Sequence, residues 1–248
     1  MKLPSIEDLL AAGTHFGHQT RRWNPKMKRF ILAEKNGIHV INLKKTLEGL
    51  EAAGEVVKKA TGEGKSVLFV GTKVTARTAI QSAADKSGQY FVTKRWLGGM
   101  LTNFQTVKQS IRRMDRIDQM EREGLFQEMQ KKEALVLNRE RSKLEDVFSG
   151  IRYMRGLPGV VIVSDIAHEH LAVAEARRLN IPVIAICDSN VNPEKADYVI
   201  PGNDDAVKSV SIIVDYLAGN VEKKAVKTEA KKPAPAKAKK PVKAATKA

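Results

Sequence analysis

The sequence contains little cysteine, few aromatic residues and no long apolar run. Cys187 is the single cysteine among 248 residues, which excludes a disulfide framework and favours a reducing compartment, the cytoplasm. No segment reaches about 18 consecutive apolar residues, and the opening stretch "MKLPSIEDLLAAG" lacks the apolar core of a signal peptide. We therefore expect neither a membrane span nor a secretory leader.

Acidic residues are scarce relative to basic ones. The 43 Lys and Arg residues outnumber 28 Asp and Glu residues, and the net charge of +15 favours a polyanionic partner such as nucleic acid. Residues 221–248 contain ten of the Lys residues and two Glu residues, so about half of the net charge lies in them. Because their Lys, Ala and Pro composition leaves almost nothing to bury, we predict a disordered basic tail there.

Known catalytic motifs are missing. The sequence has neither GxGxxG nor GxSxG. The stretch "GEGKS" (62–66) resembles the end of a phosphate-binding loop, but Lys59 stands where the first glycine is needed, so we predict a solvated turn. His168 and His170 in "HEH" face different sides of a helix and lack the HExxH spacing of a zinc site. An enzyme that binds a phosphorylated ligand is therefore the weaker hypothesis, and a DNA-binding architectural protein would lack a recognisable reading helix.

Short apolar runs alternate with helical patterns in the larger part of the chain. Four runs predict strands buried on both faces: "SVLFVG" (66–71), "GVVIVS" (159–164), "IPVIAIC" (181–187) and "ADYVIPG" (196–202). Helical patterns lie at 73–87, 168–179 and 204–218. The alternation predicts βαβ units, a parallel sheet and an α/β fold.

The first 60 residues predict smaller elements. Ser5 begins a short capped helix, and Asn36-Gly37 between two apolar segments predicts a β-hairpin over 29–41. A helical period follows from 43 to 60. We interpret residues 14–30 as a loop.

One connection is too long for a simple βαβ unit. About 65 residues separate "YFVT" (90–93) from the next apolar run, and such length without its own structure is uncommon in a compact domain. Apolar residues recur at helical spacing from Val107 to Met114 and again from Ala134 to Ile151, with "EREGLF" as a turn between them. We predict an antiparallel coiled-coil helical hairpin over 104–151, inserted into an α/β domain formed by 1–103 and 152–220.

Two basic segments interleave their charges with aromatic, glycine and amide residues. The first, without an acid, includes Arg21, Arg22, Trp23, Lys26 and Lys28. The second includes Lys94, Arg95, Trp96, Gly98-Gly99 and Asn103. Arginine forks match phosphate oxygens, and a flat Trp ring can stack on a base, so these segments are candidates for RNA binding. The alternative is two basic loops whose tryptophans pack in the core.

Acidic residues follow two consecutive predicted strands. Asp188 follows "IPVIAIC", and Asp204 and Asp205 follow "ADYVIPG". Because ligands of parallel sheets lie outside the carboxyl ends of the strands, these carboxylates should converge. If the loop that holds His18 folds over the same edge, the four side chains can bind one divalent cation, zinc or magnesium. The alternative is that Asp204 and Asp205 begin a helix, where acids are expected without any metal.

Several stretches resemble one known family. "AAGTHFGHQTRRWNPKMKRFI", "YFVTKRWLGGMLTNF", "HEHLAVAEARRLNIPVIAICDSN" and "ADYVIPGNDDA" are similar, in this order, to the bacterial small-subunit ribosomal protein two family, over about residues 3–220. Ser189 stands where family members more often have Thr. The resemblance implies a flavodoxin-like three-layer fold with a coiled-coil hairpin, and a non-catalytic role in translation.

The resemblance also implies partners and contact residues. It implies binding to 16S rRNA between the head and the body of the subunit, contact with neighbouring small-subunit proteins, and help in docking the mRNA-binding ribosomal protein one, with no small-molecule substrate. It favours the divalent cation at His18. The RNA-facing residues that it implies are Arg21, Arg22, Trp23, Lys94, Arg95, Trp96 and Asn103, with Arg112, Arg113 and Arg116 of the predicted hairpin in support. Lys26 and Lys28 join them as candidates because they belong to the same basic segment.

Overall fold

A computed structural model describes residues 2–222 of the chain. The tail predicted for 221–248 lies outside the described residues from 223 onward. None of the helices in the described part combines the length and the apolar character that crossing a membrane requires.

Five parallel strands form the main sheet. They are β4 (Val67–Val70), β5 (Tyr90–Val92), β6 (Val160–Val163), β7 (Val183–Cys187) and β8 (Tyr198–Pro201). Their order in the sheet is β5-β4-β6-β7-β8, and every neighbouring pair is parallel. This is the strand order of flavodoxin-like folds, with the order reversing between β4 and β6. The predicted α/β fold with a parallel sheet is confirmed.

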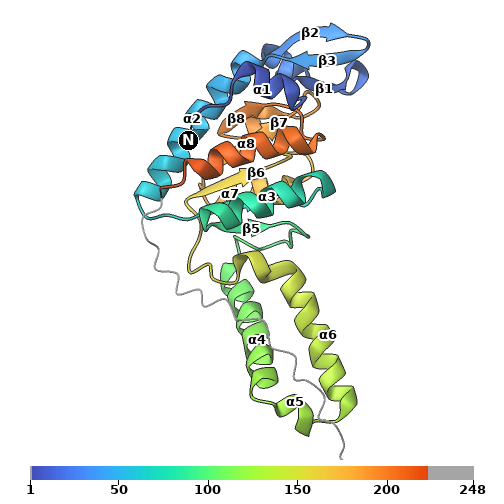
Figure 1. Ribbon diagram of the computed structural model, residues 1–248, viewed down its shortest axis with the longest axis vertical. Helices are drawn as coiled ribbons and strands as arrows, with labels where there is room; N and C mark the ends of the chain where they lie inside the picture. The colour runs from blue at the N-terminus through green and yellow to red at the C-terminus, as the bar shows by residue number, and fades with distance from the viewer. Residues whose placement is uncertain (1, 223–248) are drawn as a thin grey trace, which may run out of the picture.

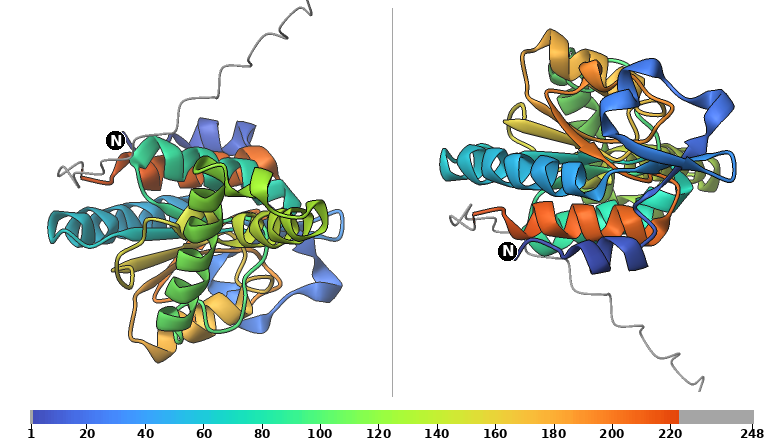
Figure 2. Two further views of the ribbon diagram at one scale, coloured as in Figure 1. Left: turned by 90° about the horizontal axis from the view of Figure 1, so that it is seen from below. Right: turned by 90° about the horizontal axis from the view of Figure 1, so that it is seen from above.

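Helices cover both faces of this sheet (Figures 1 and 2). One face packs against α2 (Leu43–Gly62), α3 (Val74–Ser87) and α8 (Val207–Gly219), and the other against α7 (His170–Arg178) and residues 96–104. The side chains of β4 alternate between the two cores: Val67 and Phe69 enter the first, and Leu68 and Val70 the second. Because both faces are buried, the strands are continuously apolar, which is why they could be recognised in the sequence.

A smaller antiparallel sheet stands at one end of the molecule, after the capped helix α1 (Ile6–Ala11). It contains β1 (Phe16–Gln19), β2 (Ile31–Lys35) and β3 (Ile38–Ile41) in the order β1-β3-β2. Asn36 and Gly37 both have positive φ, 53° and 73°, as the turn of a two-residue hairpin requires. The predicted hairpin is confirmed.

The loop predicted for residues 14–30 is partly wrong. This segment contains β1 and two 3₁₀ helices, η1 (Thr20–Arg22) and η2 (Pro25–Phe30). Asn24 and Pro25 account for the start of η2, because the Asn24 side chain accepts a hydrogen bond from the Lys26 amide and Pro25 occupies the first helical position. Strand β1 forms by pairing with β3 about 20 residues later, a non-local pairing that local sequence pattern does not reveal.

The inserted segment forms two long helices that project from the body (Figure 1). Helices α4 (Phe104–Arg122) and α6 (Lys131–Phe148) run antiparallel, since Arg113 pairs with Glu140 and Arg141 pairs with Asp118. The short helix α5 (Leu125–Glu128) lies at the predicted turn. Coiled-coil side-chain packing between the two long helices stays a prediction.

The hairpin joins the body beside the edge strand β5. Residues Ser149–Ile151 form the 3₁₀ helix η3, and its backbone passes so close to β5 that a Cβ on Gly150 would overlap the carbonyl oxygen of Phe91. Arg152 then reaches back to α4, with its guanidinium 2.6 Å from Asp118 Oδ2. A last 3₁₀ helix, η4 (Pro193–Lys195), connects β7 to β8.

We expect Gly150→Ala to lower the free energy of unfolding by about 1–3 kcal/mol, because the new methyl group must displace the backbone of β5. Gly156→Ala is the matched control, since Gly156 is exposed and a Cβ there meets no atom within 4 Å. Urea unfolding of both variants measures the difference. Equal stability of the two variants would show that the close contact with β5 is unimportant.

Candidate functional site

The first basic segment is anchored to the protein on its inner side, and its charged side chains are exposed to solvent. Met27 is fully buried, and the Asn24 amide donates a 2.8 Å hydrogen bond to the carbonyl of Ser189. The cationic side chains Arg21, Arg22, Lys26 and Lys28 are exposed. Lys26 forms an ion pair with Glu194, whereas within residues 2–222 the other three form none.

Trp23 lies among these cations with its side chain accessible. It is 36% exposed, and its ring centroid lies 5.2 Å from that of the buried His39. The indole thus contacts the three-stranded sheet through His39, and the rest of it is partly accessible. Stacking on a base requires an accessible ring.

The second basic segment divides its residues between the surface and the core. Lys94, Arg95 and Asn103 are exposed, but Trp96 is only 7% exposed and belongs to the core beside α7. The stacking role predicted for Trp96 is therefore wrong, because a buried ring offers no free face. For this tryptophan the alternative, packing in the core, is the correct one.

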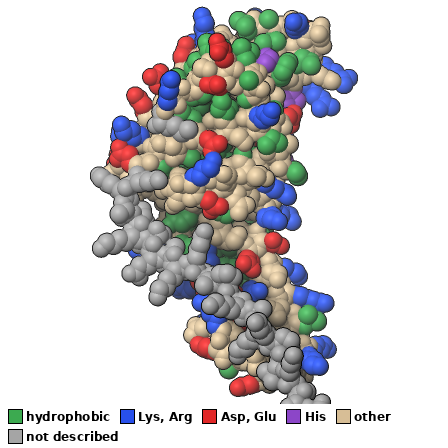
Figure 3. Space-filling view, in the orientation of Figure 1, with side chains coloured by type: hydrophobic (Ala, Val, Ile, Leu, Met, Phe, Trp, Pro, Cys, Tyr) green, Lys and Arg blue, Asp and Glu red, His purple; other side chains and the backbone are tan. Residues whose placement is uncertain are grey.

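The predicted hairpin arginines have different surroundings. Arg112 and Arg116 are exposed one helical turn apart on α4. Arg113 is exposed too, but its guanidinium donates to both carboxylate oxygens of Glu140, at 2.9 and 3.0 Å. Figure 3 shows Lys and Arg side chains along one edge of the molecule, from the three-stranded sheet down to the hairpin.

The sequence did not predict the carboxylate that shapes the second basic segment. Glu175, on α7, accepts five hydrogen bonds from residues 96–102: from the Trp96 indole, from the amides of Gly99, Leu101 and Thr102, and from the Thr102 hydroxyl. Burial acts to raise the pKa of Glu175, but these hydrogen bonds outweigh it and the pKa is lowered. The carboxylate is therefore ionised at neutral pH.

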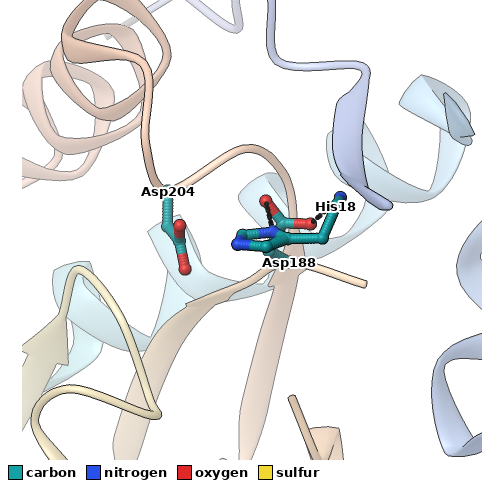
Figure 4. Close-up of side chains that lie close together, drawn as sticks. All are labelled: His18, Asp188 and Asp204. Atoms are coloured by element: carbon teal, nitrogen blue, oxygen red, sulfur yellow. Dashed lines mark hydrogen bonds and ion pairs between the residues drawn. The ribbon is translucent and has the colours of Figure 1, made fainter. Parts of the chain in front are cut away.

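The predicted acidic cluster forms at the carboxyl edge of the main sheet (Figure 4). Donor atoms of His18, Asp188 and Asp204 all lie within 4.8 Å of one another. His18 comes from β1, Asp188 from the end of β7, and Asp204 from the loop after β8. His18 Nδ1 is 3.0 Å from Asp188 Oδ2, and the His18 amide donates to Asp188 Oδ1 and to Ser189 Oγ.

Asp205 lies at the outer margin of this cluster. Its side chain is 58% exposed, with Oδ2 3.6 Å from His18 Nε2. The capping alternative for the two acids is wrong, because α8 begins only at Val207 and has no side-chain cap. Instead, Asn203 Oδ1 accepts hydrogen bonds from the amides of Asp205 and Ala206, which delays the helix.

A lysine that we did not predict from the sequence lies beside these acids. Lys73 Nζ is 2.6 Å from Asp205 Oδ1, 3.0 Å from Asp204 Oδ1 and 3.4 Å from Asp165 Oδ2. Its burial acts to lower its pKa, but hydrogen bonds to Asp205 and Asp204 raise it overall, so Lys73 is charged. Its position directly after β4 was the available signal, since the carboxyl ends of parallel strands share one edge.

The acids of this cluster, Asp165, Asp188, Asp204 and Asp205, outnumber its two basic side chains, His18 and Lys73. Burial, followed by the charges of Asp165 and Asp188, raises the pKa of Asp204 to about 7. The hydrogen bond to Asp188 raises the pKa of His18. Asp188 and Asp204 are each 1% exposed, so water offers them little stabilisation. A pocket of about 310 Å³ joins His18 and Asp188 to Arg21 and Arg22 at the surface.

At the place where this fold class binds small ligands, a carboxylate of the chain accepts hydrogen bonds from the loop after β4. The order of strands reverses between β4 and β6, and Thr72 lies just after β4. Its amide and hydroxyl both donate to Glu169 Oε1, at 2.6 and 2.7 Å, and Glu169 is 2% exposed. These two donors of Thr72 are therefore already satisfied and are not free to bind a phosphate.

We expect Glu175→Gln to lower the free energy of unfolding by about 1–2 kcal/mol at neutral pH, because hydrogen bonds to a charged acceptor are stronger than those to an amide. The folded-state pKa of Glu175 lies below its ordinary value of 4.5. The stabilisation by the carboxylate is thus fully present above that value and is lost as the pH falls through the lowered pKa.

Urea unfolding of the wild type and the variant, at neutral pH and at pH values below the ordinary pKa of Glu, measures this difference. The two free energies should approach each other as the pH falls. A difference independent of pH would contradict a stabilising role for the carboxylate charge.

Comparison with known proteins agrees with these observations. A family model described as ribosomal protein S2 matches residues 9–224. Two proteins named "Small ribosomal subunit protein uS2", from two strains of Treponema pallidum, one of them the Nichols strain, are each 48% identical to this chain over 221 residues, which is 89% of this chain and 76% of each relative. The chain belongs to the ribosomal protein S2 family.

Proposed function

We propose that this chain is a cytoplasmic, non-catalytic constituent of the small ribosomal subunit whose exposed basic segments bind 16S rRNA. The main support for this proposal comes from the segment after β1, where Arg21, Arg22 and Lys28 are exposed and form no ion pair within residues 2–222. Family membership supports the structural role in translation. The hydrogen bonds from Thr72 to Glu169 occupy two donors that a phosphorylated ligand could use, which favours this role over the enzyme alternative.

The geometry suits recognition of RNA by shape and charge. Cationic side chains neutralise phosphates and release counterions, and this term dominates affinity while carrying little sequence information. Trp23 adds a partly open ring for an unstacked base. Lys94, Arg95, Arg112 and Arg116 extend the exposed positive charge toward the hairpin.

Two finer elements of the proposal are supported by the family resemblance alone. These are the location between the head and the body of the subunit and the docking of ribosomal protein one. We assign neither to particular residues.

We expect Arg21→Ala combined with Arg22→Ala to reduce the salt dependence of 16S rRNA binding. Each lost phosphate contact lowers the slope of log K against log salt concentration by about one. The slope should fall by about one to two. Filter binding at several salt concentrations measures it.

The matched control is Lys58→Ala combined with Lys59→Ala. These lysines are also exposed, and replacing them with alanine removes the same net charge. They lie near the end of α2, about 22 Å along the helix from its start beside β3. The control should change the slope less. An unchanged slope in the arginine variant would remove the first basic segment from the interface.

We further propose that His18, Asp188 and Asp204 bind one divalent cation, with Asp205 at the margin. Imidazole nitrogen and carboxylate oxygen suit zinc, and the carboxylates with water suit magnesium. The excess of buried negative charge supports a cation, which would keep Asp204 ionised. Lys73 is a competing cation already beside Asp204.

We expect His18→Ala and Asp204→Asn each to reduce the zinc or magnesium content of protein purified without added metal, because each variant removes a ligand. Asp85→Asn, an exposed acid on α3, is the control and should leave the content unchanged. Elemental analysis by mass spectrometry measures all of them. Equal metal content in the wild type and every variant would end the cation proposal.

A further inference from the structure

The segment that connects β5 to α4 has almost no regular structure of its own. Residues 93–103 contain no helix or strand. Within residues 96–103, two backbone hydrogen bonds occur, from Met100 to Leu97 and from Asn103 to Gly99. Gly99 has a φ of 90°, in the region that favours glycine, so the chain bends sharply there. Something outside the segment must define its shape.

The Glu175 carboxylate provides that definition. Oε1 accepts from the Trp96 indole at 3.0 Å and from the Gly99 amide at 2.8 Å. Oε2 accepts from the amides of Leu101 and Thr102 at 2.9 and 3.0 Å, and from the Thr102 hydroxyl at 3.0 Å. One ionised group therefore binds both halves of the bend, and hydrogen bonds to a charged acceptor are the strong ones.

The same bend separates buried from exposed side chains. Trp96, Met100 and Leu101 are at most 7% exposed and anchor the segment in the core. Lys94, Arg95 and Asn103 are exposed on its outer side. The outer side chains flank the residues that Glu175 binds, and Lys94 Nζ also lies 3.9 Å from Asp146 Oδ1 on α6.

We propose that Glu175 is a positioning residue for RNA binding, which fixes residues 94–103 in the shape that presents Lys94 and Arg95 to phosphates. The inference rests on the proposed function and deepens it. Glu175 itself contacts no RNA in this view: its carboxylate is directed to the inner side of the bend, and its negative charge would repel phosphate.

The charge change in Glu175→Gln allows a positioning role to be distinguished from a simple electrostatic effect. Glu175→Gln adds one unit of positive charge, which by electrostatics alone strengthens binding to RNA. We expect the opposite, weaker binding of a 16S rRNA transcript, because the outer cations lose their fixed positions. Glu51→Gln, an exposed residue of α2, makes the same charge change away from the bend and should bind as tightly as the wild type or slightly tighter.

A double-mutant cycle separates positioning from general destabilisation. Effects of independent sites multiply to within about a factor of two. We expect Glu175→Gln to weaken binding in the wild type but to have little further effect in the variant carrying Lys94→Ala and Arg95→Ala, since those side chains no longer need positioning. Multiplicative effects of the two changes would overturn the proposal.

Fluorescence shows directly whether the bend has changed. In a Trp23→Phe background, Trp96 is the single tryptophan, and weakening of its hydrogen bond to residue 175 in Glu175→Gln should shift its emission while the protein stays folded by circular dichroism. If Glu175→Gln fails to fold, Thr102→Val replaces it in the cycle, because this change removes one of the five donors and keeps the side-chain shape.

The outcomes distinguish this proposal from the one on which it rests. Wild-type affinity of the Lys94→Ala, Arg95→Ala variant would remove this segment from the RNA interface and overturn the positioning role, while the proposed function would still rest on the first basic segment. Absence of salt-dependent 16S rRNA binding by the wild type would overturn both. Weak binding of that variant together with wild-type affinity of Glu175→Gln would overturn only the positioning role.

Discussion

The five strands of the main sheet run in one direction, and this constraint determines where the chain concentrates its charged side chains. Because all carboxyl ends meet at one edge, Lys73, Asp165, Asp188 and Asp204 come together from four separate loops. Buried carboxylates need partners, and His18 provides one from a different sheet. Its contacts with Asp188 and Ser189 therefore also attach the N-terminal three-stranded sheet to the body.

Charges of the two signs have different tasks in this architecture. Acidic groups act inside: Asp188 holds β1, and Glu175 holds the bend before α4. Exposed basic side chains such as Arg21 and Arg95 lie on the segments that those acids fix in place, whereas Lys73 lies among the buried acids. A few acidic side chains thus fix the segments that carry the exposed basic side chains.

The fold and half of the site could be predicted from the sequence because their signals are local. Strands buried on both faces are continuously apolar, and the topology of a parallel sheet brings the ends of β7 and β8 together, which placed Asp188 and Asp204 correctly. Non-local contacts could not be predicted. Trp96 has the same basic neighbours as a stacking residue would have, but it packs in the core and donates to a carboxylate 79 positions later.

The hydrogen bonds between Thr72 and Glu169 join the loop after β4 to the start of α7. Glu169 is tethered to the same chain, so its carboxylate is always present at high effective concentration and no soluble anion competes with it on equal terms. The two hydrogen bonds therefore form an internal bridge at the point where the order of the strands reverses, and the polypeptide alone provides both ends of that bridge.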